Sequence, residues 1–135
     1  NTKMIVLNYP NNPTGKILPR KLLDSIVQTA KEHDLYILSD EIYDYYYTDG
    51  DLKAPDIWTE YGYEKTIVTK SFSKSYAMTG YRIGWVIAEP SIIEKMSKLQ
   101  ALSLTNVSEP IQYVALQALK SEEAVAENSK IIKSR

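Results

Sequence analysis

The chain contains no cysteine, and its 135 residues include one histidine and one phenylalanine. The lack of cysteine excludes disulfides, thiolate zinc sites and cysteine nucleophiles. The apolar runs are far shorter than a membrane span, and no signal-peptide pattern opens the chain. A formal net charge of −1 gives no electrostatic reason to expect a nucleic acid or an anionic membrane as a partner. We therefore expect a globular protein of the cytoplasm, without a nucleic-acid or membrane partner.

Hydrophobic patterning predicts strands that alternate with helices. The predicted strands are Met4 to Asn8, Leu35 to Ser39, Thr66 to Ser71 and Tyr81 to Ala88. The predicted helices are Pro19 to about His33, a short turn from Glu41 to Tyr45, Ser91 to about Leu104, about Glu109 to Leu119, and Glu122 to Lys133. Ser91 and Glu94 form a capping-box pattern. Asp49 to Asp51 and Pro55 predict a polar loop.

The order of these elements predicts the fold class. The strands lack the inside/outside alternation of a half-exposed sheet, and this favours an α/β fold in three layers, with a mostly parallel sheet flanked by helices. In such sheets, ligands bind at the carboxyl ends of the strands. Asn12, Asp40 and the segment Ser71 to Lys74 all follow predicted strand ends. We therefore expect a ligand site at this edge of the sheet.

Lys74 is the first candidate for chemistry. It lies in the segment Ser-Phe-Ser-Lys-Ser-Tyr-Ala-Met-Thr-Gly-Tyr-Arg, which begins at Ser71 and places Arg82 eight positions after the lysine. A surface lysine on a polar loop is the alternative, and the hydroxyls and small residues around Lys74 disfavour it. The setting suits an amine that loses its proton and attacks a carbonyl group.

Two further motifs lie upstream. Asn8 to Gly15 reads Asn-Tyr-Pro-Asn-Asn-Pro-Thr-Gly, and Ser39 to Tyr43 reads Ser-Asp-Glu-Ile-Tyr. Pro13 restricts Asn12 toward an extended conformation, so its amide can be held rigidly. Asp40 by itself is equally consistent with a cap for the next turn. Tyr43, three residues later, would face the same way as Asp40 in a helical turn.

The order and spacing of the three motifs resemble the cofactor-binding core of class I/II aminotransferases, which are fold-type I pyridoxal-phosphate enzymes. The resemblance runs from about Met4 to about Trp85. It implies pyridoxal 5'-phosphate as the cofactor, an amino acid and a 2-oxo acid as substrates, and a homodimer as the full-length enzyme. It also implies that Tyr81 to Ala88 is the one antiparallel strand of the sheet.

The resemblance implies a role for each candidate residue. Lys74 would form the Schiff base and move the substrate α-proton, and Asp40 would pair with the pyridine nitrogen of the cofactor. Tyr43 and Asn12 would hydrogen-bond the phenolic oxygen of the cofactor. Ser71 and Arg82 would bind the phosphate, with Ser73 as a weaker candidate.

Other parts of the family have no counterpart in the sequence. These are the glycine/serine-rich phosphate loop, the aromatic residue that stacks on the cofactor, the arginine for the substrate carboxylate, and the small domain. We therefore expect residues 1–135 to be a fragment of the large domain that is inactive alone, with an undefined amino donor. Two alternatives remain: a lyase or synthase of the same fold, and a ligand-sensing domain of a transcriptional regulator.

No metal site is predicted. His33 lies near a helix end, where it complements the helix dipole. Glu41 adjoins Asp40, but no further histidine or carboxylate cluster completes a coordination shell around them.

Overall fold

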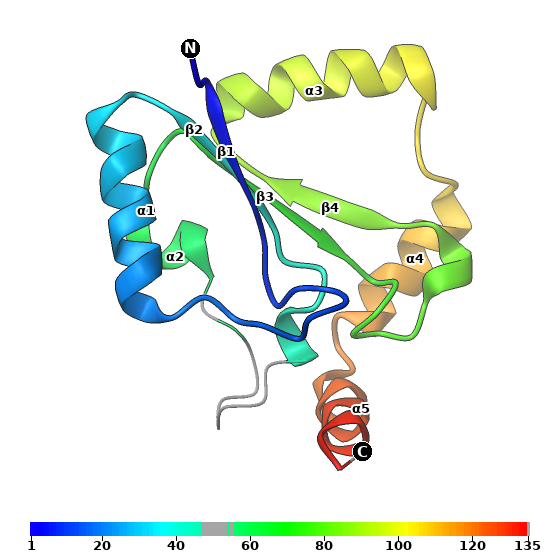
Figure 1. The fold of residues 1–135 in the computed structure, drawn as a ribbon. Helices are drawn as coiled ribbons and strands as arrows, with labels where there is room; N and C mark the ends of the chain where they lie inside the picture. Colours follow the sequence, from blue (N-terminus) through cyan, green and yellow to red (C-terminus); the bar gives the residue numbers. More distant parts are fainter. Residues whose placement is uncertain (47–53, 55, 135) are drawn as a thin grey trace.

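The computed structural model describes residues 1–46, 54 and 56–134 and contains a four-stranded sheet (Figure 1). The strands β1 (Met4–Asn8), β2 (Tyr36–Asp40), β3 (Thr66–Ser71) and β4 (Gly84–Ile87) lie side by side in that order. β1, β2 and β3 are parallel, and β4 is antiparallel to β3. The predicted fold class, including the antiparallel last strand, is therefore confirmed. The polar loop predicted around residues 49–51 and 55 lies outside the described residues.

Helices flank the sheet. They are α1 (Arg20–Glu32), η1 (Asp44–Tyr46), α2 (Ile57–Tyr61), η2 (Thr79–Tyr81), α3 (Pro90–Ser103), α4 (Glu109–Ala118) and α5 (Glu122–Lys133), where η marks a 3-10 helix. In Figure 1, α1 and α2 lie to the left of the sheet, α3 lies above it and α4 lies to its right. α5 packs beside η1. Across the described part of the chain, every helix is too short or too polar to cross a bilayer.

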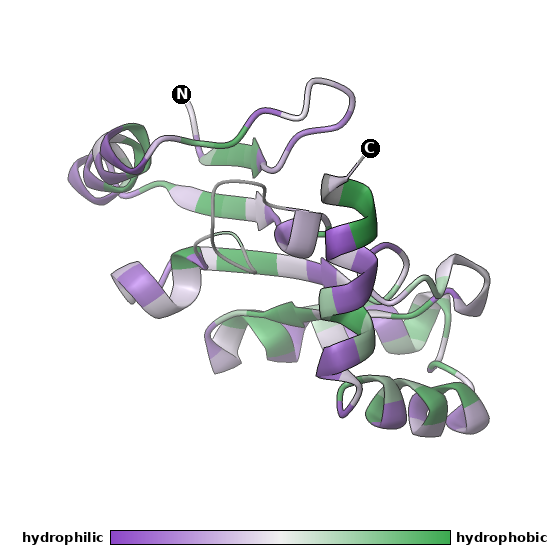
Figure 2. Cartoon of the chain, turned by 90° about the horizontal axis from the view of Figure 1, so that it is seen from below, coloured by the Kyte–Doolittle hydropathy of each residue, from purple (hydrophilic) through white to green (hydrophobic). Residues whose placement is uncertain are grey.

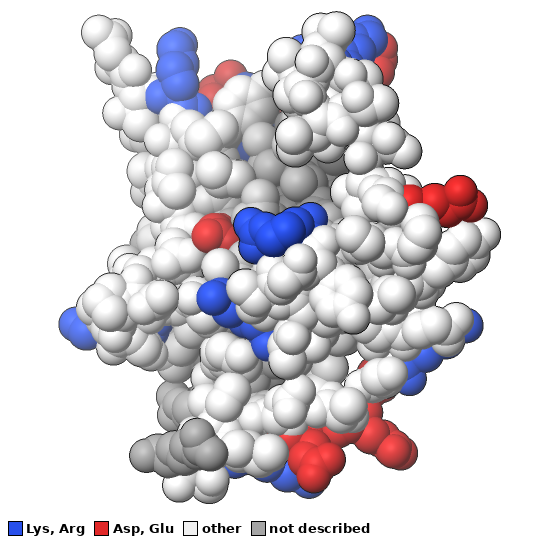
Figure 3. Space-filling view, turned by 90° about the vertical axis from the view of Figure 1, so that its right-hand side faces the viewer, with Lys and Arg blue, Asp and Glu red and all other residues white. Residues whose placement is uncertain are grey.

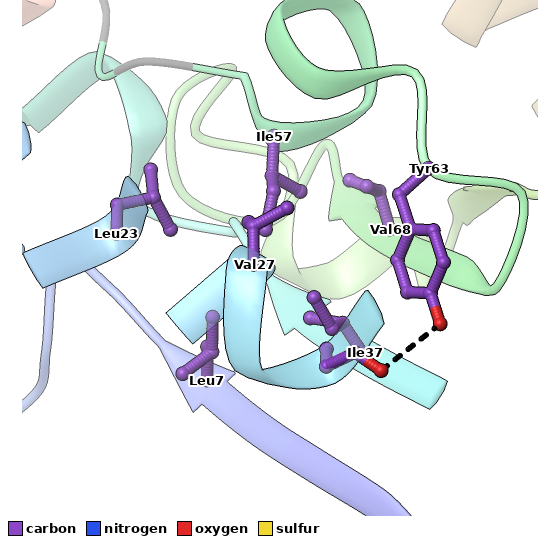
Figure 4. Packing of buried hydrophobic residues seen from close by; sticks show 8 residues of the cluster. Leu7, Leu23, Val27, Ile37, Ile57, Tyr63 and Val68 are labelled. Carbon is purple, nitrogen blue, oxygen red and sulfur yellow. Dashed lines mark hydrogen bonds between the residues drawn. The ribbon is translucent and has the colours of Figure 1, made fainter. Parts of the chain in front are cut away.

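One face of the sheet packs on α1 and α2. Helix α1 buries one side, which Leu23, Val27 and Ala30 form, whereas much of its remaining surface is hydrophilic (Figure 2). These side chains meet strand residues such as Leu7, Ile37 and Val68 (Figure 4). The Tyr63 hydroxyl donates hydrogen bonds to the carbonyl oxygens of Ala30 at 3.3 Å and Leu35 at 2.8 Å. Since successive strand side chains point to opposite faces, every second strand residue faces away from this core.

Strand β4 is shorter than predicted. The 3-10 helix η2 and the left-handed backbone of Arg82 (φ 53°) occupy the start of the predicted segment. The ladder with β3 therefore begins only at Gly84, which pairs with Ser71. A Cβ atom on Gly84 would lie 2.5 Å from the carbonyl oxygen of Lys70, so this close approach of the two strands requires glycine.

Two other predicted starts are wrong by one to three residues. The capping box at Ser91 is absent, because α3 begins at Pro90 with Glu89 as its N-cap and no side-chain cap. The fixed φ of proline suits this first helical position. The short turn begins at Asp44 instead of Glu41, because the Glu41 N–H still donates to the Thr69 carbonyl at 3.0 Å and continues the sheet ladder.

Helix α2 was not predicted. Asp56 caps its start and accepts hydrogen bonds from the N–H groups of Trp58 at 3.0 Å and Thr59 at 3.1 Å. Gly62 ends it in the left-handed conformation (φ 54°). An aspartate N-cap and a glycine C-cap six positions apart are the sequence signal for this helix.

Candidate active site

A row of polar side chains crosses the carboxyl ends of β1, β2 and β3. Asn8 pairs with Asp40, and Asp40 pairs with Thr69, in the register of the sheet. The Asp40 carboxylate accepts hydrogen bonds from Asn8 Nδ2 at 3.0 Å and from Thr69 Oγ1 at 3.1 Å. All three side chains point away from the core that α1 covers, because Leu7, Ile37 and Val68, at odd spacing from them, face that core. The orientation of Asp40 is therefore fixed from both neighbouring strands.

Asn12 and Tyr43 meet across this row. Asn12 Nδ2 donates to the Tyr43 hydroxyl at 3.0 Å, although the two residues are 31 positions apart. The loop that carries Asn12 closes through a hydrogen bond from the Gly15 N–H to the Asn11 carbonyl at 2.8 Å. Gly15 has φ +66°, which favours glycine at this position. The Asn11 side chain points elsewhere, as expected, and donates to Asn8 Oδ1 at 3.1 Å.

Lys74 follows β3 and turns toward Tyr43. Its side chain is half-buried, and Nζ lies 5.8 Å from the centre of the Tyr43 ring. Within the described residues, no carboxylate lies at ion-pair distance from this Nζ. The Tyr46 hydroxyl donates to the Lys74 carbonyl at 2.9 Å and holds the loop backbone. Burial raises the pKa of Tyr46, so this hydroxyl keeps its proton as a donor at neutral pH.

The contact of Tyr46 with the loop of Lys74 was not predicted from the sequence. Tyr46 belongs to a run of three tyrosines, residues 45–47, in which no motif sets it apart from its neighbours. The pairing across 28 positions depends on tertiary packing, for which the sequence carries no local signal. Tyr47 lies outside the described residues.

The predicted phosphate residues lie together. Ser71, Ser73 and Arg82 line one hollow beside β4, and basic atoms gather near the middle of this side of the molecule (Figure 3). The Ser71 hydroxyl accepts a hydrogen bond from the Ser73 N–H at 3.0 Å. The Arg82 side chain is exposed and donates one hydrogen bond to the Thr79 carbonyl at 3.2 Å. Most of its guanidinium N–H groups are thus exposed to solvent and can donate hydrogen bonds to a bound anion.

A second set of charges was not predicted. Lys70 is buried on the core side of β3, and its Nζ lies 3.0 Å from Glu41 Oε2, 3.2 Å from Asp44 Oδ2 and 3.0 Å from Asp56 Oδ2. Glu41 Oε1 accepts a hydrogen bond from Ser39 Oγ at 2.9 Å. Burial raises the pKa of Glu41, and Lys70 opposes that rise. We call these four charged residues the Lys70 cluster.

Metal binding has no support among the described residues, where no group of three or more histidine, aspartate or glutamate side chains is placed to hold an ion. Glu41, which adjoins Asp40 in the sequence, points instead to Lys70. His33 is the C-cap of α1 and is exposed, at the helix end where it was expected.

The fold is α/β, and polar side chains gather at the carboxyl ends of its parallel strands. The family profile described as aminotransferase class I and II matches residues 1–135, and the chain belongs to this family. It is 44% identical over 124 residues to an aspartate aminotransferase of Pyrococcus horikoshii, covering 92% of this chain and 31% of the relative. It is also 44% identical over 122 residues to aromatic-amino-acid aminotransferase 2 of Thermococcus litoralis, covering 90% and 31%.

Solved structures agree with this assignment. The aromatic aminotransferase of Pyrococcus horikoshii superimposes with a TM-score of 0.88 and 38% identity, over 98% of this chain and 35% of that chain. An aspartate aminotransferase of Thermus thermophilus gives a TM-score of 0.88 and 32% identity, over 98% and 34%. The chain therefore spans about a third of the length of the relatives that it matches.

Proposed function

We propose that residues 1–135 form the central part of the large, cofactor-binding domain of a pyridoxal-phosphate-dependent aminotransferase. The observation that carries this proposal is the convergence of three loops at one edge of the sheet. Asn12 bonds the Tyr43 hydroxyl, and Lys74 Nζ lies over the Tyr43 ring. Thr69, which donates to Asp40, lines the same hollow as Ser71 and Arg82. The relatives are named as aminotransferases, which favours transamination over lyase chemistry or ligand sensing.

The donors and acceptors of the site fit the proposed cofactor. When bound, pyridoxal 5'-phosphate supplies an electron sink for charge that develops at the substrate α-carbon. A carboxylate can accept about four hydrogen bonds, so Asp40 keeps capacity for a protonated ring nitrogen after bonding Asn8 and Thr69. Asn12 and Tyr43 would hold the phenolic oxygen.

The residues that would hold the cofactor phosphate are a different group from those that would hold the ring. The Ser71 hydroxyl and the Arg82 guanidinium lie in the same hollow, and an arginine fork suits phosphate oxygens. Arg82 also leaves most of its donors unused by the described protein, as an anion site requires.

Lys74 would carry the chemistry of the chain. Its Nζ has no carboxylate partner among the residues that the structure describes, and it faces the Tyr43 ring. An amine so placed can bind the carbonyl carbon of the cofactor and can also take and return the α-proton of the substrate. Lys70 cannot replace it, because three carboxylates hold the Lys70 ammonium on the other face of the sheet.

The names of the relatives favour aspartate or an aromatic amino acid as the donor and a 2-oxo acid as the acceptor. We assign none of the described residues to the choice between these donors. We further propose that the full-length enzyme is a homodimer of the cytoplasm.

Product analysis of the full-length protein tests this function. With cofactor, aspartate or an aromatic amino acid, and 2-oxoglutarate, we expect glutamate and the matching 2-oxo acid in equal amounts. Lys74→Ala is the control for background transamination by free cofactor. Release of ammonia without glutamate would indicate a lyase, and amino-acid binding without turnover would indicate a ligand-sensing domain. Either result would overturn the proposal.

The isolated 135-residue chain should behave differently. We expect weak cofactor binding at most and negligible transamination. Only Ser71 and Arg82 are assigned to the phosphate, and none of the described residues is assigned to the substrate carboxylate. We also expect concentration-dependent self-association by light scattering, since β1 and β4 have open edges and Val6 on β1 is 64% exposed. Robust turnover by a verified monomer of this chain would contradict the fragment assignment.

A further inference from the structure

The Lys70 cluster joins three separate segments at one ammonium group. Glu41 directly follows β2, Asp44 begins η1, and Asp56 is the N-cap of α2. A lysine ammonium has three donor hydrogens, and here three carboxylates lie within 3.2 Å of it. Lys70 itself is 6% exposed. The turn between β2 and η1 is therefore fixed to β3 by charges that water does not screen.

That turn carries one side of the proposed cofactor site. Tyr43 lies between Glu41 and Asp44 in the sequence. Both of these carboxylates are bound to Lys70, so the backbone is held on each side of Tyr43. Lys70 in turn lies between Thr69, which donates to Asp40, and Ser71, which lines the phosphate hollow. Alternate strand residues face opposite sides of the sheet, so Lys70 acts from the core side on groups that face the site.

The same turn also contacts the loop of Lys74. Ser75 Oγ donates to Asp44 Oδ1 at 3.5 Å, and the Tyr46 hydroxyl donates to the Lys74 carbonyl at 2.9 Å. From behind, Ser129 on α5 donates to the Tyr45 carbonyl at 2.7 Å. The distance between Tyr43 and Lys74 is thus set by a chain of contacts that begins at Lys70.

We propose that Lys70 is a positioning residue, which holds the turn of Tyr43 against the loop of Lys74 through its ion pairs with Glu41 and Asp44. Lys70 also lines the hollow of Ser71 and Arg82, but its ammonium group is held by carboxylates on the core side of β3. Its removal would leave buried carboxylates without their cation, and their mutual repulsion would displace the turn. The inference rests on the proposed function, because the displaced groups matter only if Tyr43 and Lys74 act on the cofactor.

The test compares Lys70→Met with wild type in the full-length protein loaded with pyridoxal 5'-phosphate. We expect a shifted midpoint in the pH titration of the cofactor absorbance, because Tyr43 then sits differently against the ring oxygen. We also expect kcat to fall by about tenfold to a hundredfold, as misplacement of reacting groups does, with a smaller change in KM. Lys70→Arg keeps the charge and should recover both values to a large extent.

Val68→Ala is the matched control for lost stability. Val68 is fully buried on the same face of β3 but belongs to the apolar core. It should lower the unfolding temperature without moving the absorbance midpoint. If Lys70→Met does not fold, Asp44→Asn is tested instead. We expect it to shift the midpoint of the cofactor absorbance titration in the same way.

The outcomes separate the two proposals. A wild-type protein that shows no cofactor absorbance and no pyridoxyl group on Lys74 after borohydride reduction refutes the proposed function. A loaded wild type together with a folded Lys70→Met, or Asp44→Asn, that has the wild-type midpoint and kcat refutes the positioning role. A shift in Val68→Ala as large as that in Lys70→Met would refute it too, because general loosening would then explain the effect.

Discussion

Lys70 and Lys74 lie four residues apart in one segment, yet their ammonium groups have opposite surroundings. Lys70 is buried on the core side of the sheet and touches Glu41, Asp44 and Asp56. Lys74 lies beyond the strand end, half-buried, with Nζ over the ring of Tyr43. The same residue type thus occurs in two different environments within one short segment.

The difference shows how charge is divided between the faces of β3. Burial would lower the pKa of Lys70, but the carboxylates of Glu41 and Asp44 outweigh burial, and the net pKa of Lys70 is raised. A lysine held in this way stays protonated and is no nucleophile. Glu41 and Asp44 are directed to the core face, and the Asp40 carboxylate, on the site face, accepts hydrogen bonds from neighbouring strands instead. The core side therefore holds a fixed cation, and the site side keeps an amine without a carboxylate partner in the described chain.

Reactivity toward the cofactor should distinguish the two lysines most strongly. In the full-length protein incubated with pyridoxal 5'-phosphate, borohydride reduction should attach the pyridoxyl group to Lys74, as measured by peptide mass spectrometry. Lys74→Ala should lower turnover by at least about 10²–10⁴-fold, because the proton-transfer group is lost. The fold should remain, as judged by circular dichroism. Label on Lys70 would reverse the assignment of the two residues.

Asp40 extends the comparison to carboxylates, because it faces the site whereas Glu41 and Asp44 face the core. Asp40→Asn should lower turnover by about 10²–10³-fold, since the fixed charge opposite the ring nitrogen is lost. An asparagine oxygen can still accept a hydrogen bond from Asn8 or Thr69, so the unfolding temperature should change little. Asp24→Asn, at an exposed position of α1, is the matched control and should have normal turnover. Near-normal turnover of Asp40→Asn would remove Asp40 from the mechanism.

Arg82 tests whether the exposed cation of the site binds an anion, as the buried Lys70 binds carboxylates. Arg82→Ala should raise the dissociation constant of the cofactor by about tenfold to a hundredfold, the loss expected for a hydrogen bond to a charged group. Equilibrium dialysis or fluorescence titration of the full-length protein measures it. Arg20→Ala removes an exposed arginine that pairs with Asp24 on α1 and should leave the constant unchanged. Equal affinity of Arg82→Ala and wild type would assign the phosphate to other groups.

The site side could be predicted from the sequence because its residues occur in short motifs at strand ends. Asn12, Asp40 and Lys74 each follow a predicted strand, and parallel strands bring such positions to one edge. The family resemblance implied that Asn12 and Tyr43 bond one oxygen of the cofactor, and the structure places the two side chains 3.0 Å apart.

The core side could not be predicted in the same way. A lysine within a strand is normally expected to be exposed. Lys70 is buried because carboxylates from three other segments surround it, and no local sequence pattern indicates that these segments meet. Local rules also failed where backbone geometry overrode side-chain pattern. Pro90 moved the start of α3 ahead of the capping box, and the left-handed Arg82 shortened β4.

Glu41 tests the balance between burial and ion pairing in the Lys70 cluster, with the smallest expected effect. Burial raises the pKa of Glu41 in the folded protein above its usual value, despite the opposing charge of Lys70. A group with a raised folded pKa contributes stability that is fully present below its unfolded pKa and is lost as the pH rises through the folded pKa. Glutamine cannot ionise and so escapes this loss. Relative to wild type, Glu41→Gln should therefore become progressively more stable as the pH is raised from about 4 toward 7.

Urea unfolding of both full-length proteins across this pH range measures the difference. Glu94→Gln is the matched control, because Glu94 is exposed on α3 and pairs with Lys98. Surface pairs contribute little to stability, so its difference from wild type should stay nearly constant with pH. If Glu41→Gln instead lost stability relative to wild type as the pH rose, the attraction of Lys70 would outweigh the burial of Glu41.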